Sequence, residues 1–394
     1  MAGHWSQLVI YALIVLNSQV HGRLINPKVK ITIVEDAVAK GAVCLDGSPA
    51  GYHYSDGLGD GANHWLVYLA GGGWCGTTRG CLDRVKENPG VSSTYNITHT
   101  YFDGILSPNQ TINPDFYNWT RVYVRYCDGS SFMGDVEAVD PETKLHYRGS
   151  RIYSAVVDEL LAKGLKNAHK VILAGNSAGG LATILHCDRF RELVPNATRV
   201  KCISDSGFFI HAKDLPNADV RELTFANMVA LHGVAKFLPT SCTSRMAPAL
   251  CLFPENLVRN VQTPLFLLNS AFDKFQISYN LKPYPADETG WRNCTLSTES
   301  CTLGQLQIIR DFKNTFLKTL KDAGDSSSTG LFINTCYFHD ILYSAPRWNF
   351  NELPTFGNKT VAQVVGDWYF DRSIIKLVDT QTDNPVHCHA PITS

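Results

Sequence analysis

Residues 175–180 (GNSAGG) constrain the fold of this chain more than any other stretch. They follow the apolar run 171–174 and precede a helix-like segment, 181–190. A strand, a tight turn and a helix, with a serine at the tip and small residues beside it, form a nucleophile elbow. Its turn strains the serine backbone and holds the hydroxyl clear of the sheet. We therefore predict that Ser177 is a nucleophile; the alternative is a glycine-rich structural turn.

Strand-like runs and helix-like segments alternate along the chain, as is typical of a mostly parallel sheet with helices on both faces. Residues 83–118 are rich in Pro, Asn, Ser and Gly, and we interpret them as a long surface excursion. No linker divides the sequence, so we expect residues 23–394 to form a single domain. The strand-like runs are 65–69, 121–126, 171–174, 200–204, 264–269 and 331–335, and the helix-like segments include 151–163 and 305–320.

The composition excludes some classes of protein. Apolar residues make up 44% of the 394 residues and charged residues 18%, which describes a globular chain with a large core. The formal net charge is −1, so nothing points to a nucleic acid as partner. A charged ligand would have to be recognised by a local basic patch, because the net field is weak.

A nucleophilic serine needs a base, and the sequence supplies one in the order expected for this architecture. There, an acid and then a histidine follow the serine, on loops after later strands. Asp273 and His339 each come shortly after a later strand-like run. We predict that His339 accepts the proton of Ser177 and that Asp273 orients the imidazole. Asp205 is the rival for the acid; otherwise Asp273 and His339 are ordinary loop residues.

Glycines 71–73 follow the strand-like run 65–69 and lead into Trp74. Glycines after an early strand free backbone N–H groups to face an acyl oxygen. We predict an oxyanion hole made by the N–H groups of Gly73, Trp74 and Ala178. A phosphate-binding loop is the alternative, but the sequence has no G-x-x-x-x-G-K pattern here.

The N-terminus has the features of a secretory signal peptide. Residues 8–16 are a short apolar run, and residues 20–22 suit cleavage after Gly22. We therefore expect residues 1–22 to be removed and the protein to be secreted; an uncleaved anchor is the alternative. No second stretch is long and apolar enough to span a bilayer.

Twelve cysteines, an even number, indicate disulfides in an oxidising compartment. A zinc site is less favoured because no C-x-x-C pair is present. Close spacing suggests the local bridges Cys75–Cys81, Cys242–Cys251 and Cys294–Cys301, and leaves the other pairings open. Six sequons fit a glycosylated secreted protein, at Asn96, Asn109, Asn118, Asn196, Asn293 and Asn358.

Longer blocks of this sequence resemble the plant pectin acetylesterase family, which is related to the animal Notum-type, Wnt-deacylating carboxylesterases. The resemblance covers nearly the whole mature chain. It implies an α/β-hydrolase fold with long inserted loops, secretion to the cell wall, and release of acetate from acetylated galacturonan. It also implies that Ser177, Asp273 and His339 are catalytic and that Gly73 and Trp74 serve the oxyanion. The matching blocks are 44–49, 68–75, 118–135, 175–189, 241–244 and 366–372.

Two positions depart from the family pattern. Many members carry a cysteine just before the nucleophile and another just after the histidine, where this chain has Asn176 and Asp340. Losing both keeps the cysteine count even, so we conjecture that the two pair in relatives. This chain would then lack a disulfide that typically contributes about 2–4 kcal/mol to the free energy of unfolding. The charge of Asp340 should also raise the pKa of His339.

The resemblance implies two-step acyl transfer without a metal or cofactor, in which Ser177 takes the acetyl group and water then releases acetate. The partner would be acetylated pectin, with its carboxylates bound by Arg or Lys, and we expect a monomer. One alternative is an esterase for another acylated glycan or for a longer acyl chain, which would require a deep apolar pocket. Another is a non-catalytic carbohydrate-binding homologue, against which the intact Ser177, Asp273 and His339 argue.

Overall fold

The computed structural model of this chain describes residues 27–215, 218–281, 288–324, 326, 328–350, 357 and 359–388. The expected signal peptide, residues 1–22, lies outside them. The strands are β1 (Lys28–Ile33), β2 (Gly51–Ser55), β3 (His64–Leu69), β4 (His99–Tyr101), β5 (Thr120–Val124), β6 (Lys170–Asn176), β7 (Arg199–Asp205), β8 (Leu265–Ser270), β9 (Gly330–Asn334) and β10 (Lys376–Val378).

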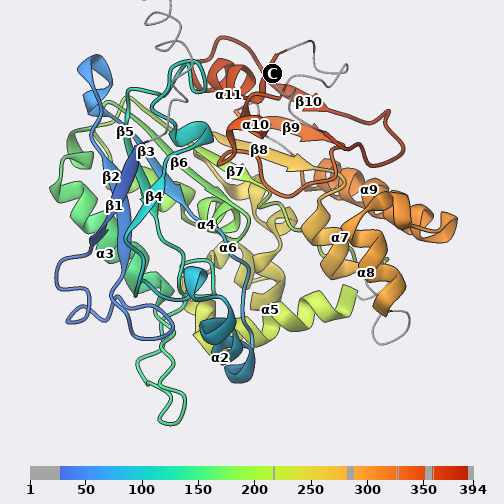
Figure 1. Ribbon diagram of the computed structural model, residues 1–394, viewed down its shortest axis with the longest axis horizontal. Helices are drawn as coiled ribbons and strands as arrows, with labels where there is room; N and C mark the ends of the chain where they lie inside the picture. Colours follow the sequence, from blue (N-terminus) through green and yellow to red (C-terminus); the bar gives the residue numbers. More distant parts are fainter. Residues whose placement is uncertain are drawn as a thin grey trace, which may run out of the picture.

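These strands form one ten-stranded sheet in the order β10-β9-β8-β7-β6-β3-β5-β2-β1-β4 (Figure 1). From β10 to β5 all neighbours are parallel. Beyond β5, the pairs with β2, β1 and β4 are antiparallel. The six strand-like runs predicted from the sequence all correspond to strands of the parallel part, so the prediction of a mostly parallel sheet is confirmed.

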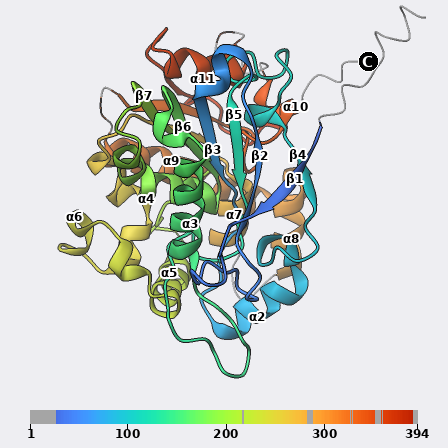
Figure 2. The ribbon, with the colours of Figure 1, turned by 90° about the vertical axis from the view of Figure 1, so that its left-hand side faces the viewer.

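Helices cover both faces of the sheet, as predicted. Side chains of α3, α4, α5 and α9 share one core cluster with the sheet, and those of α10 and α11 share the other. Figure 2 shows α3 and α4 on one side of β3, β5 and β2, with α10 on the opposite side. The α-helices are α2 (Thr78–Glu87), α3 (Gly149–Ala162), α4 (Ala178–Leu193), α5 (Ala218–His232), α6 (Thr240–Thr243), α7 (Lys274–Asn280), α8 (Glu288–Leu296), α9 (Leu303–Ala323), α10 (Ala345–Trp348) and α11 (Val361–Tyr369).

The central strands read as continuous apolar runs because both of their faces are buried. In β6, Val171 and Leu173 enter the cluster beneath α3 and α4, whereas Ile172 and Ala174 enter the cluster beneath α11. A strand sends successive side chains to opposite faces, so a strand covered twice has no polar face to present. This burial holds the end of β6, and the turn that follows it, in a fixed position.

The interpretation of residues 83–118 as a surface excursion is only partly right. The segment has little regular structure after α2, but it contributes Phe102, Ile105, Leu106 and Phe116 to the core, each at most 1% exposed. These side chains cover the face of the sheet on which α11 packs. The polar composition of the segment concealed them because they are scattered among turn-forming residues.

Twelve cysteines form six disulfides, which confirms that the even count signals bridges rather than free thiols. The three local bridges suggested by spacing are all present. The other three are Cys44–Cys127, Cys187–Cys202 and Cys336–Cys388. Within the described ranges, none of the helices has the length and apolar character that a bilayer crossing requires.

Candidate active site

Ser177 lies in the tight turn between β6 and α4. Its backbone angles, φ 54° and ψ −123°, are rare for a residue with a side chain and are held by the surrounding structure. The Ser177 N–H donates to the carbonyl of Asp205 at 2.8 Å. A side chain at Gly179 would place Cβ only 2.1 Å from the Leu69 carbonyl, so glycine is needed for α4 to approach β3. The sequence therefore forms a true elbow here, with Ser177 6% exposed.

Asp273 and His339 form a hydrogen-bonded pair. Their Oδ2 and Nδ1 atoms are 2.8 Å apart, and the Asp273 side chain is fully buried. Asp273 is also the N-cap of α7, where its Oδ1 accepts the N–H of Gln276 at 2.8 Å. This second bond fixes the carboxylate plane, so the imidazole is held in one orientation. The structure thus brings together the two residues that the sequence placed after separate strands.

Among the described residues, Asp205, the rival acid, forms no hydrogen bond with the imidazole. Its Oδ2 accepts the N–H groups of Ile341 and Leu342 at 2.6 and 2.7 Å. Asp205 therefore anchors the loop that carries His339. This geometry favours Asp273 over Asp205 as the partner of the histidine.

A hydrogen bond between the sequence neighbours of Ser177 and His339 brings the two parts of the site together. Asn176 Nδ2 donates to Asp340 Oδ2 at 3.1 Å, so the residue before the serine touches the residue after the histidine. The two positions at which the family resemblance implies cysteines in many members are thus in contact. His339 Nε2 is buried and has no hydrogen-bond partner among the described residues, Ser177 included. Catalytic hydrogen bonds are often long without substrate, so Nε2 is available to a hydroxyl that moves toward it.

The charge around His339 favours its protonated form. Burial lowers the pKa of His339, but the carboxylate of Asp273, with contributions from Asp340 and Asp205, outweighs burial and leaves the pKa above 6.5. Arg347 holds Asp340 through an ion pair at 2.8 Å. An imidazole in this setting can accept a proton and keep it through a reaction step.

The loop after β3 packs against the elbow. The N–H of Gly71 donates to Asn176 Oδ1 at 2.9 Å, and Gly73 adopts φ +70°, which glycine tolerates. Within the described part of the chain, the N–H groups of Gly73, Trp74 and Ala178 have no backbone or side-chain acceptor. Unused N–H donors next to a serine can bind a developing oxyanion.

Aromatic side chains surround the imidazole. The Phe275 ring stacks on that of His339 with centroids 5.0 Å apart, and Phe209 lies at 6.4 Å. Trp74 packs edge-on against Phe209, Phe225 and Phe275 at 4.8, 5.2 and 6.2 Å. The sequence analysis named Trp74 but missed the phenylalanines that surround it. Phe275, two residues beyond Asp273, was the only local sign of the cluster.

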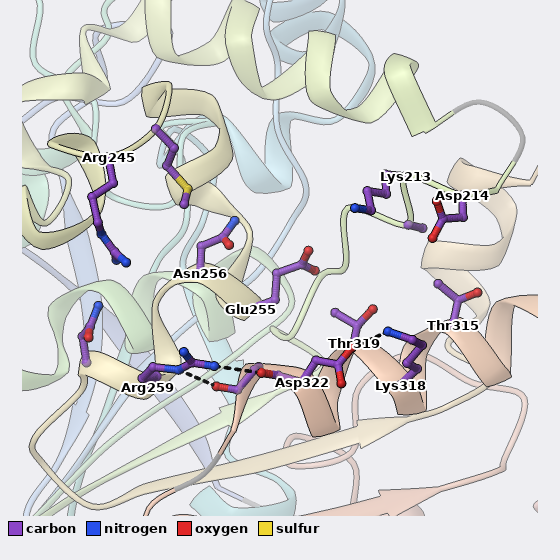
Figure 3. A pocket seen from close by; sticks show the side chains of 14 residues that line it. Lys213, Asp214, Arg245, Glu255, Asn256, Arg259, Thr315, Lys318, Thr319 and Asp322 are labelled. Atoms are coloured by element: carbon purple, nitrogen blue, oxygen red, sulfur yellow. Dashed lines mark hydrogen bonds and ion pairs between the residues drawn. The ribbon is translucent and has the colours of Figure 1, made fainter.

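Two other features bear on ligand binding. Cys75, Cys81 and His232 have ligand-type atoms within 4.8 Å of one another, but the two sulfurs form a disulfide and offer no thiolate to a metal. A separate pocket of about 370 Å³ lies beside α9, bordered by Arg245, Glu255 and other polar side chains (Figure 3). None of the predicted site residues lines that pocket.

Comparison with known proteins gives a consistent result. The model of the family described as Pectinacetylesterase matches residues 25–389. Pectin acetylesterase 11 of Arabidopsis thaliana is 45% identical over 381 residues, covering 96% of this chain and 95% of that protein. Pectin acetylesterase 7 of the same plant is also 45% identical, over 384 residues, 97% of this chain and 96% of that protein.

More distant relatives share the fold. The mouse palmitoleoyl-protein carboxylesterase NOTUM is 28% identical over 312 residues, 76% of this chain and 58% of that protein. The solved structure of the Wnt deacylase Notum from Drosophila superposes with a TM-score of 0.76 at 23% identity, over 91% of this chain and 98% of that chain. The α/β-hydrolase-like fold expected from the sequence is therefore confirmed.

Proposed function

This chain belongs to the pectinacetylesterase family, and we propose that it is a secreted serine esterase that removes acetyl groups from cell-wall pectin. The observation that carries the proposal is the strained Ser177 at the end of β6, on the sheet edge that also bears the Asp273–His339 pair. The similarity to two pectin acetylesterases supports the substrate class.

In the proposed mechanism, Ser177 Oγ attacks the acetyl carbonyl carbon while His339 Nε2 accepts its proton. The N–H groups of the oxyanion loop and of Ala178 stabilise the negative oxygen, and one such donor is worth about 3 kcal/mol. Collapse of the intermediate expels the sugar oxygen, which takes the proton from His339. Water then attacks the acetyl-serine by the reverse sequence and acetate leaves. Asp273 keeps the Nδ1 proton in place throughout.

Secretion is part of the proposal. The disulfides suit an oxidising compartment, and the sequon residues Asn96, Asn196 and Asn293 are exposed. The Asn118 side chain donates to Asp60 instead, and Asn358 lies outside the described residues. We further propose that residues 1–22 are removed and that residues 23–394 act as one monomeric domain.

Acetate release from a polysaccharide tests this function. We expect the enzyme to release acetate from acetylated pectin faster than from acetylated xylan at equal ester concentration, because only the pectin backbone is built of uronic acids. Acetate assays on both polymers, with heat-inactivated enzyme as control, measure this. Binding to pectin without acetate release would instead support a non-catalytic homologue.

Short acyl chains should be preferred. Trp74, Phe209 and Phe275 pack against one another, and Phe275 stacks on His339; we propose that this cluster leaves room for a short acyl group only. We expect kcat/KM for p-nitrophenyl octanoate to be at least about tenfold below that for the acetate ester. A series from acetate to octanoate measures this, and a preference for octanoate would refute acetyl specificity.

The acid limb of the pH profile should depend on Asp340. Activity requires neutral His339, whose pKa lies above 6.5, so kcat/KM should fall as the pH drops through that pKa. Asp340→Asn removes a charge that stabilises the imidazolium, and should therefore shift the acid limb to lower pH. Asp322→Asn is the control, because the Asp322 carboxylate is exposed and pairs with Lys318. An acid limb unchanged by Asp340→Asn would contradict the assignment of the limb to His339.

A further inference from the structure

Two arginines close to the oxyanion loop form no ion pair in the part of the chain that the structure describes. Arg84 lies on α2, and Arg125 directly follows β5. No described carboxylate forms an ion pair with either, although many other arginines are paired. The paired ones include Arg79, Arg148, Arg151, Arg199, Arg347 and Arg372.

Backbone carbonyls hold both guanidinium groups in place. Arg84 Nη2 donates to the carbonyls of Gly72 and Val91 at 2.6 and 3.1 Å. Arg125 Nη2 donates to the carbonyl of Gly90. Both arginines therefore donate hydrogen bonds to the same short turn, Pro89–Val91. A carbonyl accepts a hydrogen bond without cancelling the charge, so two fixed positive groups remain.

Each guanidinium also lies over a tyrosine ring. The centroid distances are 5.6 Å from Arg84 to Tyr126 and 5.9 Å from Arg125 to Tyr123. Both Nε atoms are buried without a hydrogen-bond partner in the described structure. The side chains are thus ordered before any ligand arrives, which reduces the entropy lost on binding.

Both arginines lie near the C-terminal ends of the parallel strands, where the turn with Ser177 is also located. Apart from its chain neighbours, a Cβ built at Gly73 would meet only Arg84 Nη1, at 4.0 Å, so Arg84 borders the oxyanion loop. In the sheet, Val124 pairs with Leu69, which pairs with Gly175. With strands about 4.8 Å apart, the Arg125 backbone begins about 10 Å from the end of β6. That distance suits a group on a sugar near the one being deacetylated.

We propose that Arg84 and Arg125 bind carboxylates of the uronic acid units that flank the acetylated sugar. The inference rests on the proposed function and names residues that recognise the polymer. The N–H groups of each guanidinium that the backbone carbonyls leave unused can donate to a carboxylate, and a neutral glycan offers no such charged group. The two arginines would therefore make the esterase selective for anionic acetylated chains.

Arg125 is the residue to test, because Arg84 also contacts Gly72 in the oxyanion loop. The variants are Arg125→Gln, Arg125→Lys and, as matched control, the exposed Arg79→Gln on α2. For each, kcat/KM on acetylated pectin is divided by kcat/KM on p-nitrophenyl acetate. Arg125→Gln should lower this ratio at least about tenfold, mainly through KM. Arg125→Lys should retain part of the ratio, and Arg79→Gln all of it.

The outcomes separate this inference from the proposed function. Equal loss on both substrates would make Arg125 a structural clamp of the turn and overturn the inference. If the wild type hydrolyses p-nitrophenyl acetate but releases no acetate from pectin, the proposed function fails. Inhibition of p-nitrophenyl acetate hydrolysis by trigalacturonate then decides: inhibition that Arg125→Gln abolishes supports the subsite, and no inhibition of the wild type refutes it.

Discussion

Replacing Ser177 with alanine is expected to abolish ester hydrolysis while leaving the protein folded. Without Oγ there is no nucleophile, and loss of such a serine lowers kcat by about 10⁶-fold when the rest of the site is intact. The hydroxyl donates to no described residue, and alanine keeps the Cβ, so we expect the unfolding temperature to change by less than about 2 °C.

Initial rates on p-nitrophenyl acetate and acetylated pectin, together with thermal unfolding, measure this. Ser206→Ala is the matched control, because Ser206 directly follows the neighbouring strand β7 and also has a positive φ. Its Oγ accepts the Asp340 N–H at 2.9 Å and donates to Asp205 Oδ1, so we expect Ser206→Ala to keep ester hydrolysis. An Ser177→Ala variant with activity within tenfold of wild type would show that another group attacks the ester.

Asp273→Asn should lower kcat by about 10³–10⁴-fold. Aspartate uses one oxygen for the Gln276 N–H and the other for His339 Nδ1. Asparagine has a single oxygen, so keeping the helix cap turns its amide N–H toward the imidazole. The ring would then carry its proton on Nε2, where it cannot accept one from Ser177.

Asp205→Asn is the matched control for that variant. The asparagine oxygen can still accept the N–H groups of Ile341 and Leu342, so we expect less than a tenfold loss of kcat. Comparison of kcat for the two variants, with unfolding temperatures for each, separates the roles. A severe loss with Asp205→Asn and a mild one with Asp273→Asn would reassign the acid.

The sequence revealed the parallel strands because burial on both faces leaves a simple signal. Leu265–Ser270 and Lys170–Asn176 are almost wholly buried and are apolar over most of their length. The antiparallel strands were missed. Their burial is partial, as in Lys28–Ile33, or their length is only three residues, as in His99–Tyr101. The parallel strand Lys376–Val378, also three residues long, was missed for the same reason. Pairing partners distant in the chain, not local pattern, make these segments strands.

The candidate site, like the strands, could be predicted only in part from the sequence. The order of serine, acid and histidine, each after a separate strand, indicated Ser177, Asp273 and His339, and the structure adds the contact between the last two. The anchoring role of Asp205 depends on N–H groups 136 and 137 residues away, which no local pattern encodes. The hydrogen bond from Arg125 to the Gly90 carbonyl likewise joins residues that are distant in the sequence, so no local pattern predicts it.

The central claim, that Ser177 accepts an acetyl group from pectin, can be tested by trapping the intermediate. Enzyme mixed with excess acetylated pectin is quenched in acid during turnover, digested and mapped by mass spectrometry. We predict a peptide heavier by one acetyl group, with the modification on Ser177, and its absence when unacetylated pectin is used. Continued acetate release with Ser177 unmodified, or with the acetyl group on a different residue, would contradict the account.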